Sequence, residues 1–483
     1  YLLTLVLKTR NKSYTNTLAL IVKKNMKKLL IIIIFLNVSI VFGQDNGKIK
    51  NQSIEKKLTS QYFNNERTIK ISLPTDFDNT KKYPVIYTLD GFGLFEITSS
   101  YSKFLMDYDV IPKAIVVSIF HNNRNYETSP NYGQNINIPK TEFLEGSEKL
   151  KNHLINEVKP LIDKEYPTSN YNILIGHSNT ATFVNELITK DYNPFQAFIA
   201  LSPDLVDEQI NHFKKHIDNK SEKIVYFVSS GIKDDKYRLE TGIKLDTVFK
   251  ANKDKNLFQH KIYKAGHLDL VPKSLNDALM FVFSDYRNFD DLDIKSKVSS
   301  FSIKTYLNEK INNTNTIYGI STTLNEDDYF YIIEQMITKK NKLLLDEMLE
   351  ISEKNNFYPE NHLYSDRAQT YEAAEFYEEA LKNWKLQIEN GFYQNTFYFE
   401  RPLKLLNKEL NRPKEGIEFL KSSMEKYPEG KLVFNYWIAK TILGNDLKRK
   451  DGIKAIDYCI KNFRENRKFS LEDAKKVQLK LKK

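Results

Sequence analysis

Polar residues with the chemistry of an acyl-transfer site follow predicted strands along this chain. Ser178 stands directly after the apolar run 171–175, in the sequence Gly176-His177-Ser178, and a helical pattern begins with the next residues. A strand, a sharp turn and a helix in this order lift the serine hydroxyl above a sheet edge. The same turn aims the backbone N–H of Asn179 at the position of an oxyanion. Ser178 is therefore the candidate nucleophile.

The candidate acid and base stand farther along the chain. Asp234 follows the apolar run 223–230, and His267 lies in a loop between a shorter strand pattern and a helical one. Serine, aspartate and histidine in this order are typical of α/β-hydrolases, in which the histidine takes the serine proton and the carboxylate orients the imidazole. Asp235 and Glu240 are alternatives for the acid, because the pattern does not define the path of this loop.

Residues from about 56 to 283 resemble the esterase family of the α/β-hydrolases, which includes ferric-siderophore esterases, S-formylglutathione hydrolases and feruloyl or acetylxylan esterases. The resemblance rests on separated motifs in the family's order, namely 66–74, 83–91, 123–130, 143–144, the segment around Ser178, and 266–275. It implies an α/β-hydrolase fold, with a mostly parallel sheet and helices on both faces. It also implies a serine hydrolase that cleaves carboxylic esters and needs no cofactor or metal.

The resemblance implies a second oxyanion donor and shows one departure. The Leu-Asp-Gly turn at 89–91 is similar to the family's donor turn, which would place the N–H of Phe92 opposite that of Asn179. The family usually has glycine two residues after the serine, where this chain has Thr180. Because glycine permits tight packing of the turn, a threonine indicates a slightly shifted elbow.

Substrate-binding candidates lie in loops after predicted strands. A siderophore-type ester calls for a basic and aromatic pocket, and the candidates for its lining are Arg124, Tyr126 and Arg238, together with Tyr132, Lys236 and Tyr237.

The N-terminal region predicts export. Residues 26–43 combine Met26-Lys27-Lys28 with an apolar run and a predicted cleavage after Gly43, which is typical of a signal peptide. Residues 1–25 are interpreted as a non-native upstream extension. A membrane anchor is the alternative, although the apolar run is shorter than the roughly 18–20 residues that span a bilayer. The predicted location is the periplasm or the medium of a bacterium.

Composition excludes some other classes of protein. The formal charge is +10, but the first 43 residues hold seven basic and no acidic side chains, and without them it falls to +3. A charge this small gives no electrostatic footprint for nucleic acid. Cys459 is a lone cysteine, so no internal disulfide can form. His212 and His216 have helical spacing in a lysine-rich segment and are interpreted as a solvated face, so no metal site is predicted.

The C-terminal part has a different pattern. We assign 44–290 to the hydrolase domain, 291–316 to a polar linker and 317–483 to an all-α domain. One register recurs every 36 residues in that domain, at Leu344-Leu345, Ala380-Leu381, Gly416-Ile417 and Gly452-Ile453. Such a repeat resembles tetratricopeptide repeats, and an irregular helical bundle is the alternative. Either array could bind a protein partner, cover the site or mediate dimerisation.

Three functional hypotheses follow. The leading one is an exported serine esterase, with siderophore-type esters as one candidate substrate class. The second is a non-catalytic hydrolase-fold scaffold whose helical repeats bind a partner, which the departure at Thr180 favours. The third is an acyltransferase, whose chemistry at Ser178 is the same and whose acceptor differs.

Overall fold

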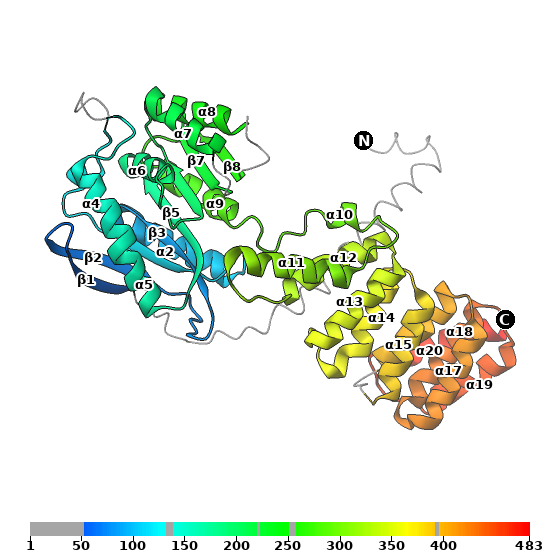
Figure 1. Ribbon diagram of the computed structural model, residues 1–483. Helices are drawn as coiled ribbons and strands as arrows, with labels where there is room; N and C mark the ends of the chain where they lie inside the picture. The colour runs from blue at the N-terminus through cyan, green and yellow to red at the C-terminus, as the bar shows by residue number, and fades with distance from the viewer. Residues whose placement is uncertain (1–52, 132–138, 220–222, 251–256, 392–395) are drawn as a thin grey trace, which may run out of the picture. The chain divides into compact units, whose positions relative to one another are not determined.

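The computed structural model describes residues 53–131, 139–219, 223–250, 257–391 and 396–483 (Figure 1). The predicted extension 1–25 and signal peptide 26–43 lie outside the described residues. Within the described ranges, no helix combines the length and the apolar character needed to cross a membrane.

A single mixed sheet organises the first part of the chain. Its strands are β1 (Ile54–Ser60), β2 (Asn65–Ser72), β3 (Tyr83–Thr88), β4 (Ile115–Ile119), β5 (Thr168–His177), β6 (Ala197–Leu201), β7 (Val225–Gly231) and β8 (Leu257–Tyr263). They lie in the order β1-β2-β4-β3-β5-β6-β7-β8. The pairs β1–β2 and β2–β4 are antiparallel, and the pairs among β3 to β8 are parallel. The predicted α/β-hydrolase fold is confirmed.

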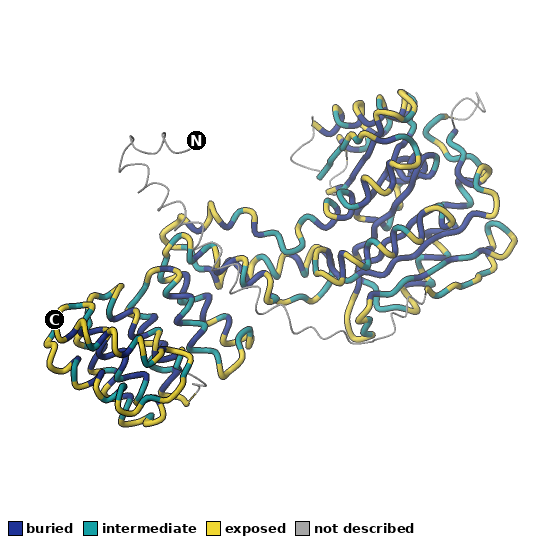
Figure 2. The backbone as a smooth tube through the Cα atoms, turned by 180° about the vertical axis from the view of Figure 1, so that it is seen from behind, coloured by how far each residue is buried: buried dark blue, intermediate teal, exposed yellow. Residues whose placement is uncertain are grey.

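The central strands are apolar because both of their faces are covered. Val85 and Tyr87 of β3 face one core, and Ile86 between them faces the other. Strand β4 alternates in the same way at Val116 and Val117. In Figure 2 the colour of buried residues runs along most of the central strands.

Helices cover both faces of the sheet (Figure 1). They are α2 (Gly91–Asp107), α3 (Arg124–Thr128), α4 (Glu145–His153), α5 (Lys159–Glu165), α6 (Asn179–Ile188), α7 (Asp207–Asn219), α8 (Lys236–Lys250) and α9 (Leu270–Val282). A π-helical turn, Leu154–Val158, joins α4 to α5. The buried side chains of α4 to α8 share one core with the sheet, and those of α2 and α9 share the other. Functional residues at the carboxyl ends of the parallel strands are therefore held on a rigid support.

The segment predicted as a linker, 291–316, is helical over much of its length. This segment contains α10 (Leu292–Lys295) and most of α11 (Ile303–Tyr318). Helix α11 has few apolar residues, which concealed its periodicity, but Ile303, Tyr306 and Leu307 are buried along it. Its last residue, Tyr318, is 1% exposed and belongs to the same core as α2 and α9. The hydrolase core therefore continues beyond the predicted boundary at residue 290.

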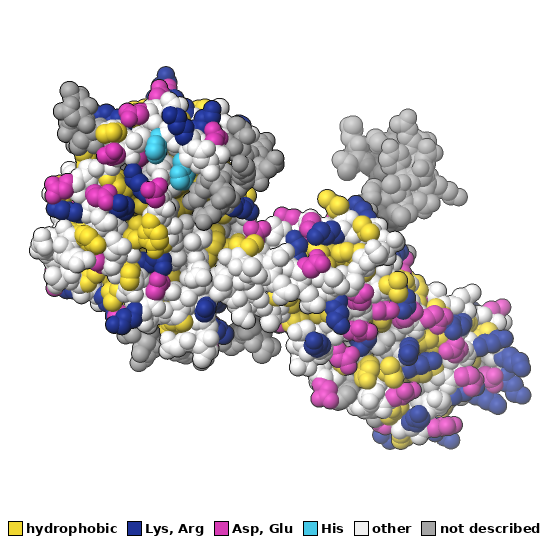
Figure 3. Space-filling view, in the orientation of Figure 1, with side chains coloured by type: hydrophobic (Ala, Val, Ile, Leu, Met, Phe, Trp, Pro, Cys, Tyr) yellow, Lys and Arg dark blue, Asp and Glu magenta, His cyan; other side chains and the backbone are white. Residues whose placement is uncertain are grey.

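The remaining chain is helical, as predicted. Its helices are α12 (Glu326–Lys339), α13 (Lys342–Asn355), α14 (Leu363–Ala373), α15 (Tyr377–Glu389), α16 (Phe397–Lys404), α17 (Pro413–Lys426), α18 (Lys431–Gly444), α19 (Arg449–Lys461) and α20 (Leu471–Lys482). A π-helical turn at Leu405–Glu409 and short 3₁₀ turns at Glu360–His362 and Pro428–Gly430 complete it. Basic and acidic side chains are interspersed over most of the face seen in Figure 3.

The 36-residue register falls on alternate helices, α13, α15, α17 and α19. Glycine in this register allows close packing of neighbouring helices. A Cβ at Gly416 would lie 3.0 Å from the Leu403 side chain, and one at Gly452 would lie 3.0 Å from Ile442. The repeat in the sequence thus marks positions where helices approach closely.

Candidate active site

Ser178 occupies the turn between β5 and α6. The strand ends at His177 and the helix begins at Asn179, so the turn is one residue long. Ser178 has φ 62° and ψ −124°, a strained conformation for a residue with a side chain. Gly176 permits this turn, because a Cβ there would lie 2.3 Å from the carbonyl oxygen of Thr180. The geometry is that of a nucleophile elbow.

Asp234 and His267 lie together at the same edge of the sheet. Asp234 follows β7, and its Oδ2 and Oδ1 lie 3.0 and 3.1 Å from His267 Nδ1. Because a carboxylate accepts, Nδ1 carries the proton and Nε2 is left as the basic nitrogen. Of the alternative acids, Asp235 accepts a hydrogen bond from Tyr237, and Glu240 pairs with Lys236. Asp234 is the predicted acid that reaches the histidine.

Ser202 adds a hydrogen bond that the sequence did not reveal. It follows β6 with φ 60°, and its Oγ donates to Asp234 Oδ2 at 2.6 Å. Burial acts to raise the pKa of Asp234, but the hydrogen bonds from Ser202 and His267 hold it below its ordinary value. Asp234 is therefore ionised at neutral pH. Serine followed by proline at a strand end is a common pattern, so the sequence carried no distinguishing signal.

His177 supports the histidine loop. Its Nε2 lies 2.9 Å from the backbone carbonyl oxygen of His267, and the two imidazole rings are 4.6 Å apart. Since a carbonyl only accepts, Nε2 of His177 carries a proton in this arrangement. Burial, followed by the neighbouring His267, lowers the pKa of His177 to about 4. His177 therefore stays uncharged beside His267 at neutral pH.

The side chains of Ser178 and His267 form no hydrogen bond with each other in the described structure. Ser178 is 9% exposed, and its Oγ has no hydrogen-bond partner among the described residues. The side chain of His267 is 35% exposed at the opening of the site. Contacts between a catalytic serine and its histidine often tighten when substrate binds. The arrangement holds the base oriented and leaves the serine hydroxyl free.

The two oxyanion candidates occupy first turns of helices. Phe92 is the second residue of α2, and Asn179 is the first residue of α6. Backbone N–H groups in a first turn have no carbonyl partner within their helix, so they are available to an anion. Asp90, with φ 59°, forms the turn that leads into α2. Both predicted donors thus lie on rigid elements that begin beside the elbow.

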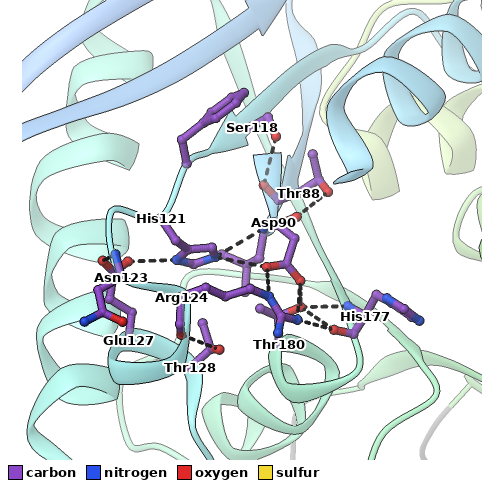
Figure 4. Close-up of polar contacts among 12 residues, drawn as sticks. Thr88, Asp90, Ser118, His121, Asn123, Arg124, Glu127, Thr128, His177 and Thr180 are labelled. Carbon is purple, nitrogen blue, oxygen red and sulfur yellow. Dashed lines mark hydrogen bonds and ion pairs between the residues drawn. The ribbon is translucent and has the colours of Figure 1, made fainter. Parts of the chain in front are cut away.

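Asp90 is the centre of a network of polar side chains (Figure 4). Its carboxylate accepts from Arg124 Nε at 2.6 Å and Nη2 at 2.9 Å, and from the Thr180 hydroxyl at 2.8 Å. Its backbone N–H donates to His121 Nε2 at 3.2 Å. The hydrogen bond to Asp90 raises the pKa of Arg124 above its ordinary value. The predicted shift of the elbow by Thr180 does not prevent strand, turn and helix from forming.

A buried ion pair holds His121 in this network. Glu127 is 1% exposed, and its carboxylate accepts from Arg67 at 2.6 and 2.9 Å and contacts His121 Nδ1 at 2.8 Å. It also accepts the backbone N–H groups of Asn122 and Asn123. Burial opposes ionisation of Glu127, but its hydrogen bonds to His121 and Arg67 lower its pKa to about 2. Because Glu127 fixes Nδ1 of His121, the opposite nitrogen faces Asp90.

A cavity of about 440 Å³ opens beside the elbow, lined by Asp90, Phe92, Gly93, Leu94, Ile97, His121, Arg124, His177, Leu268, Val271 and Pro272. Of the predicted substrate contacts, Arg124 lines it. Tyr126 does not, and its hydroxyl accepts from Lys149 instead. Arg238 is buried and donates from Nη1 to the Ser202 carbonyl oxygen at 2.6 Å. It therefore supports Ser202, whose hydroxyl donates to Asp234.

The described residues contain no group of three or more His, Cys, Asp or Glu side chains arranged to hold a metal ion. The chemistry that this geometry supports is nucleophilic attack by a serine hydroxyl with histidine as proton acceptor.

Comparisons with known proteins match the same region. Residues 60–268 match the family described as "Putative esterase". The uncharacterized protein YjcH of Bacillus subtilis is 28% identical over 191 residues, which cover 38% of this chain and 72% of that protein.

Two solved structures extend the comparison. An IroE-like serine hydrolase from Shewanella oneidensis is 21% identical, with a TM-score of 0.48, and the match covers 62% of this chain and 98% of that chain. An uncharacterised protein from Capnocytophaga ochracea is 14% identical, with a TM-score of 0.51, and covers 89% of this chain and 99% of that chain. The second likeness concerns the fold, and it spans both the sheet domain and helices beyond it.

Proposed function

We propose, on the premise that residues 60–268 belong to the esterase family of α/β-hydrolases, that this protein is an exported serine esterase. The observation that carries the proposal is the joint placement of three residues at one edge of the sheet. Ser178 stands on a one-residue elbow, and Asp234 orients His267 through Nδ1 at 3.0 Å. The proposed reaction is hydrolysis of a carboxylic ester through an acyl-enzyme intermediate.

In the proposed first half-reaction, Ser178 Oγ attacks the ester carbonyl carbon and its proton passes to His267 Nε2. Asp234 stabilises the imidazolium that forms. The carbonyl oxygen becomes an oxyanion that accepts from the N–H groups of Phe92 and Asn179, and such donors typically each contribute about 10²–10³ in kcat. Collapse of this intermediate breaks the bond to the alcohol, which takes the proton from His267.

In the second half-reaction, water replaces the alcohol. His267 takes a proton from the water as it attacks the acyl carbon, and the same donors hold the second oxyanion. Collapse releases the carboxylic acid and returns the proton to Ser178 Oγ. If another hydroxyl entered in place of water, the product would be a new ester, which is the acyltransferase alternative.

The lining of the cavity favours an ester with an apolar acyl group. Phe92, Leu94, Ile97, Val271 and Pro272 supply apolar walls beside the elbow. Each methylene group buried there contributes about 0.8 kcal/mol. An uncharged acyl group of moderate size is therefore the proposed minimal substrate.

A siderophore-type ester is the more specific candidate, and Arg124 is the cation that such an anionic substrate would meet in the cavity. Two of its nitrogens already hold Asp90. An anionic substrate would therefore have to share this guanidinium with the Asp90 carboxylate. This competition weakens the attraction between the substrate and Arg124. A neutral ester meets no such competition.

The C-terminal helices are proposed to form tetratricopeptide-like repeats that bind a protein partner or mediate dimerisation. The 36-residue register on α13, α15, α17 and α19 supports this proposal, as does the close packing at Gly416 and Gly452. Export is proposed from the sequence of residues 26–43. Its test is the N-terminal sequence of protein recovered from the bacterial envelope or medium, which should begin at Gln44.

Turnover of p-nitrophenyl butyrate tests the esterase proposal. The wild-type chain should show steady hydrolysis, and Ser178→Ala should lose it while keeping the same circular dichroism and unfolding transition. Ser300→Ala is a matched control, because Ser300 is exposed and far along the chain from the site. A folded wild-type protein without turnover on a panel of esters would favour the scaffold hypothesis instead.

A further inference from the structure

Thr180 lies two residues after Ser178, in the first turn of α6, and it is fully buried. The backbone N–H of His177 donates to its hydroxyl at 2.7 Å, and Asp90 Oδ2 lies 2.8 Å from the same oxygen. The carbonyl oxygen of His177 is also within reach, at 2.9 Å. A hydroxyl has one proton, and a carboxylate is a stronger acceptor than a carbonyl, so the proton points to Asp90. Glycine could make none of these contacts.

The two partners of this hydroxyl belong to different turns (Figure 4). His177 belongs to the elbow that carries Ser178 and Asn179, whereas Asp90 belongs to the turn between β3 and α2, two residues before Phe92. The remaining link between the turns through this network is longer, since Arg124 Nη2 lies 3.4 Å from the His177 carbonyl oxygen. The backbone N–H of Leu89 also donates to the Ile175 carbonyl oxygen at 2.9 Å, where the two strands pair, and beyond this pairing the Thr180 hydroxyl is the short polar connection between the two turns.

We propose that Thr180 is a positioning residue that sets the separation of the Phe92 and Asn179 N–H groups. The inference rests on the proposed esterase function, since an oxyanion forms only if Ser178 attacks a carbonyl. Thr180 acts through Asp90 and through the elbow backbone, and it touches neither the substrate nor the reacting atoms. The donors interact more strongly with the tetrahedral oxyanion than with the ester carbonyl. Their displacement therefore lowers kcat and leaves KM nearly unchanged.

The test compares three substitutions in the full chain. Thr180→Val keeps the shape of the side chain and replaces the hydroxyl by a methyl group. Thr180→Gly removes the whole side chain, and Thr180→Ser keeps the hydroxyl. We expect valine and glycine to lower kcat for p-nitrophenyl butyrate by about 10- to 100-fold, the scale on which small misplacements of catalytic groups act. Serine should restore kcat to within about threefold of wild type, because the same hydrogen bonds can form.

A boronic acid inhibitor gives a second readout, because its adduct with a serine is tetrahedral and mimics the intermediate. Its affinity should fall in parallel with kcat in Thr180→Val and Thr180→Gly, while KM stays nearly constant. If Thr180 had a merely structural role, its replacement would lower the amount of folded protein and leave the kinetics of the folded fraction unchanged. Active-site titration gives the concentration of that fraction.

The outcomes separate the two proposals. Retention of kcat and boronate affinity in the valine and glycine variants would overturn the role of Thr180, provided that the wild type is active and Ser178→Ala is not. A parallel loss with rescue by serine supports it. A folded wild-type chain that neither hydrolyses esters nor binds the boronate overturns the esterase function, and the inference about Thr180 with it.

Discussion

His177 stands between the glycine and the serine of the elbow, where its imidazole touches the loop of the base. Its Nε2–H donates to the carbonyl oxygen of His267, and burial lowers its pKa to about 4 from an ordinary value of 6.5. Between these values the unfolded chain binds a proton at this position that the folded chain does not. Stability should therefore fall as the pH falls from about 6.5 towards 4.

Replacement of His177 by glutamine should reduce this dependence. Glutamine keeps an N–H donor and has no proton to gain. The free energy of unfolding of the His177→Gln chain should therefore change less than that of wild type between pH 7 and pH 4.5. The lowered pKa corresponds to at most about 3 kcal/mol, on the order of 1.4 kcal/mol for each pH unit. The measurement is the free energy of unfolding by urea at both pH values. An equal loss in wild type and His177→Gln would contradict the argument.

Asp234 and Asp235 are adjacent and offer a matched pair. Asp234 accepts from His267 Nδ1 and Ser202, whereas Asp235 accepts from Tyr237. Asp234→Asn should lower kcat by about 10³–10⁴, because an amide favours the wrong tautomer of the histidine. Asp235→Asn should retain kcat within a few-fold, since it touches neither Ser178 nor His267. The measurement is the steady-state kinetics of both variants with p-nitrophenyl butyrate. Equal losses of kcat in the two variants would contradict the assignment of Asp234 as the acid that orients His267.

Helix α2 carries both a candidate donor and part of the cavity wall. Its second residue is Phe92, and Leu94 and Ile97 follow on the side that faces the cavity. Because all three residues lie on α2, this helix fixes the distance from the Phe92 N–H to the apolar wall formed by Leu94 and Ile97. We therefore expect α2 to determine the length of the acyl group that fits.

A series of p-nitrophenyl esters tests this property. From acetate to hexanoate, kcat/KM should rise by up to about fourfold for each methylene group that enters the cavity, which follows from about 0.8 kcal/mol per group. Ile97→Trp should reduce the rate with hexanoate more than the rate with acetate. Phe104→Trp, at an exposed position of the same helix, is the control. A series that does not change with chain length would show that the acyl group lies elsewhere.

Strands and their terminal residues could be predicted from the sequence, because apolar runs and turn residues are local signals. The pattern placed Ser178, Asp234 and His267 each after its strand, as the structure does. The network around Asp90 could not be predicted in this way. Arg67, Thr180 and the segment 121–127, which carries both His121 and Glu127, come from three separate parts of the chain, and only their packing brings them together.

At the scale of the whole molecule, α11 joins the hydrolase core to the helical region. Tyr318 packs edge-on against Tyr171 at 4.8 Å, and its hydroxyl accepts the backbone N–H of Asp285. Arg287 adds contacts with Asp328 and with the carbonyl oxygen of Asp109. The sequence suggested a linker here because sparse apolar residues, separated by asparagine and lysine, resemble a polar connection. Tyr171, the ring that Tyr318 packs against, lies more than a hundred residues away in the chain.

Tyr318→Ala tests whether α11 stabilises the hydrolase domain. Removing a fully buried aromatic ring typically lowers the free energy of unfolding by about 3–5 kcal/mol. Loss of esterase activity in increasing urea reports the hydrolase part specifically, and its midpoint should fall. Tyr331→Ala, at a half-exposed position on α12, should leave the midpoint nearly unchanged. If the two substitutions act alike, α11 does not contribute to the core.

Covalent labelling of Ser178 tests the central claim most directly. A fluorophosphonate reacts only with a serine whose hydroxyl is activated by a nearby base. We predict one adduct per chain, located by mass spectrometry on the tryptic peptide 165–190 at Ser178, and no adduct in Ser178→Ala or after heat denaturation. A folded wild-type chain that remains unlabelled, or that carries the adduct on another residue, would contradict the account.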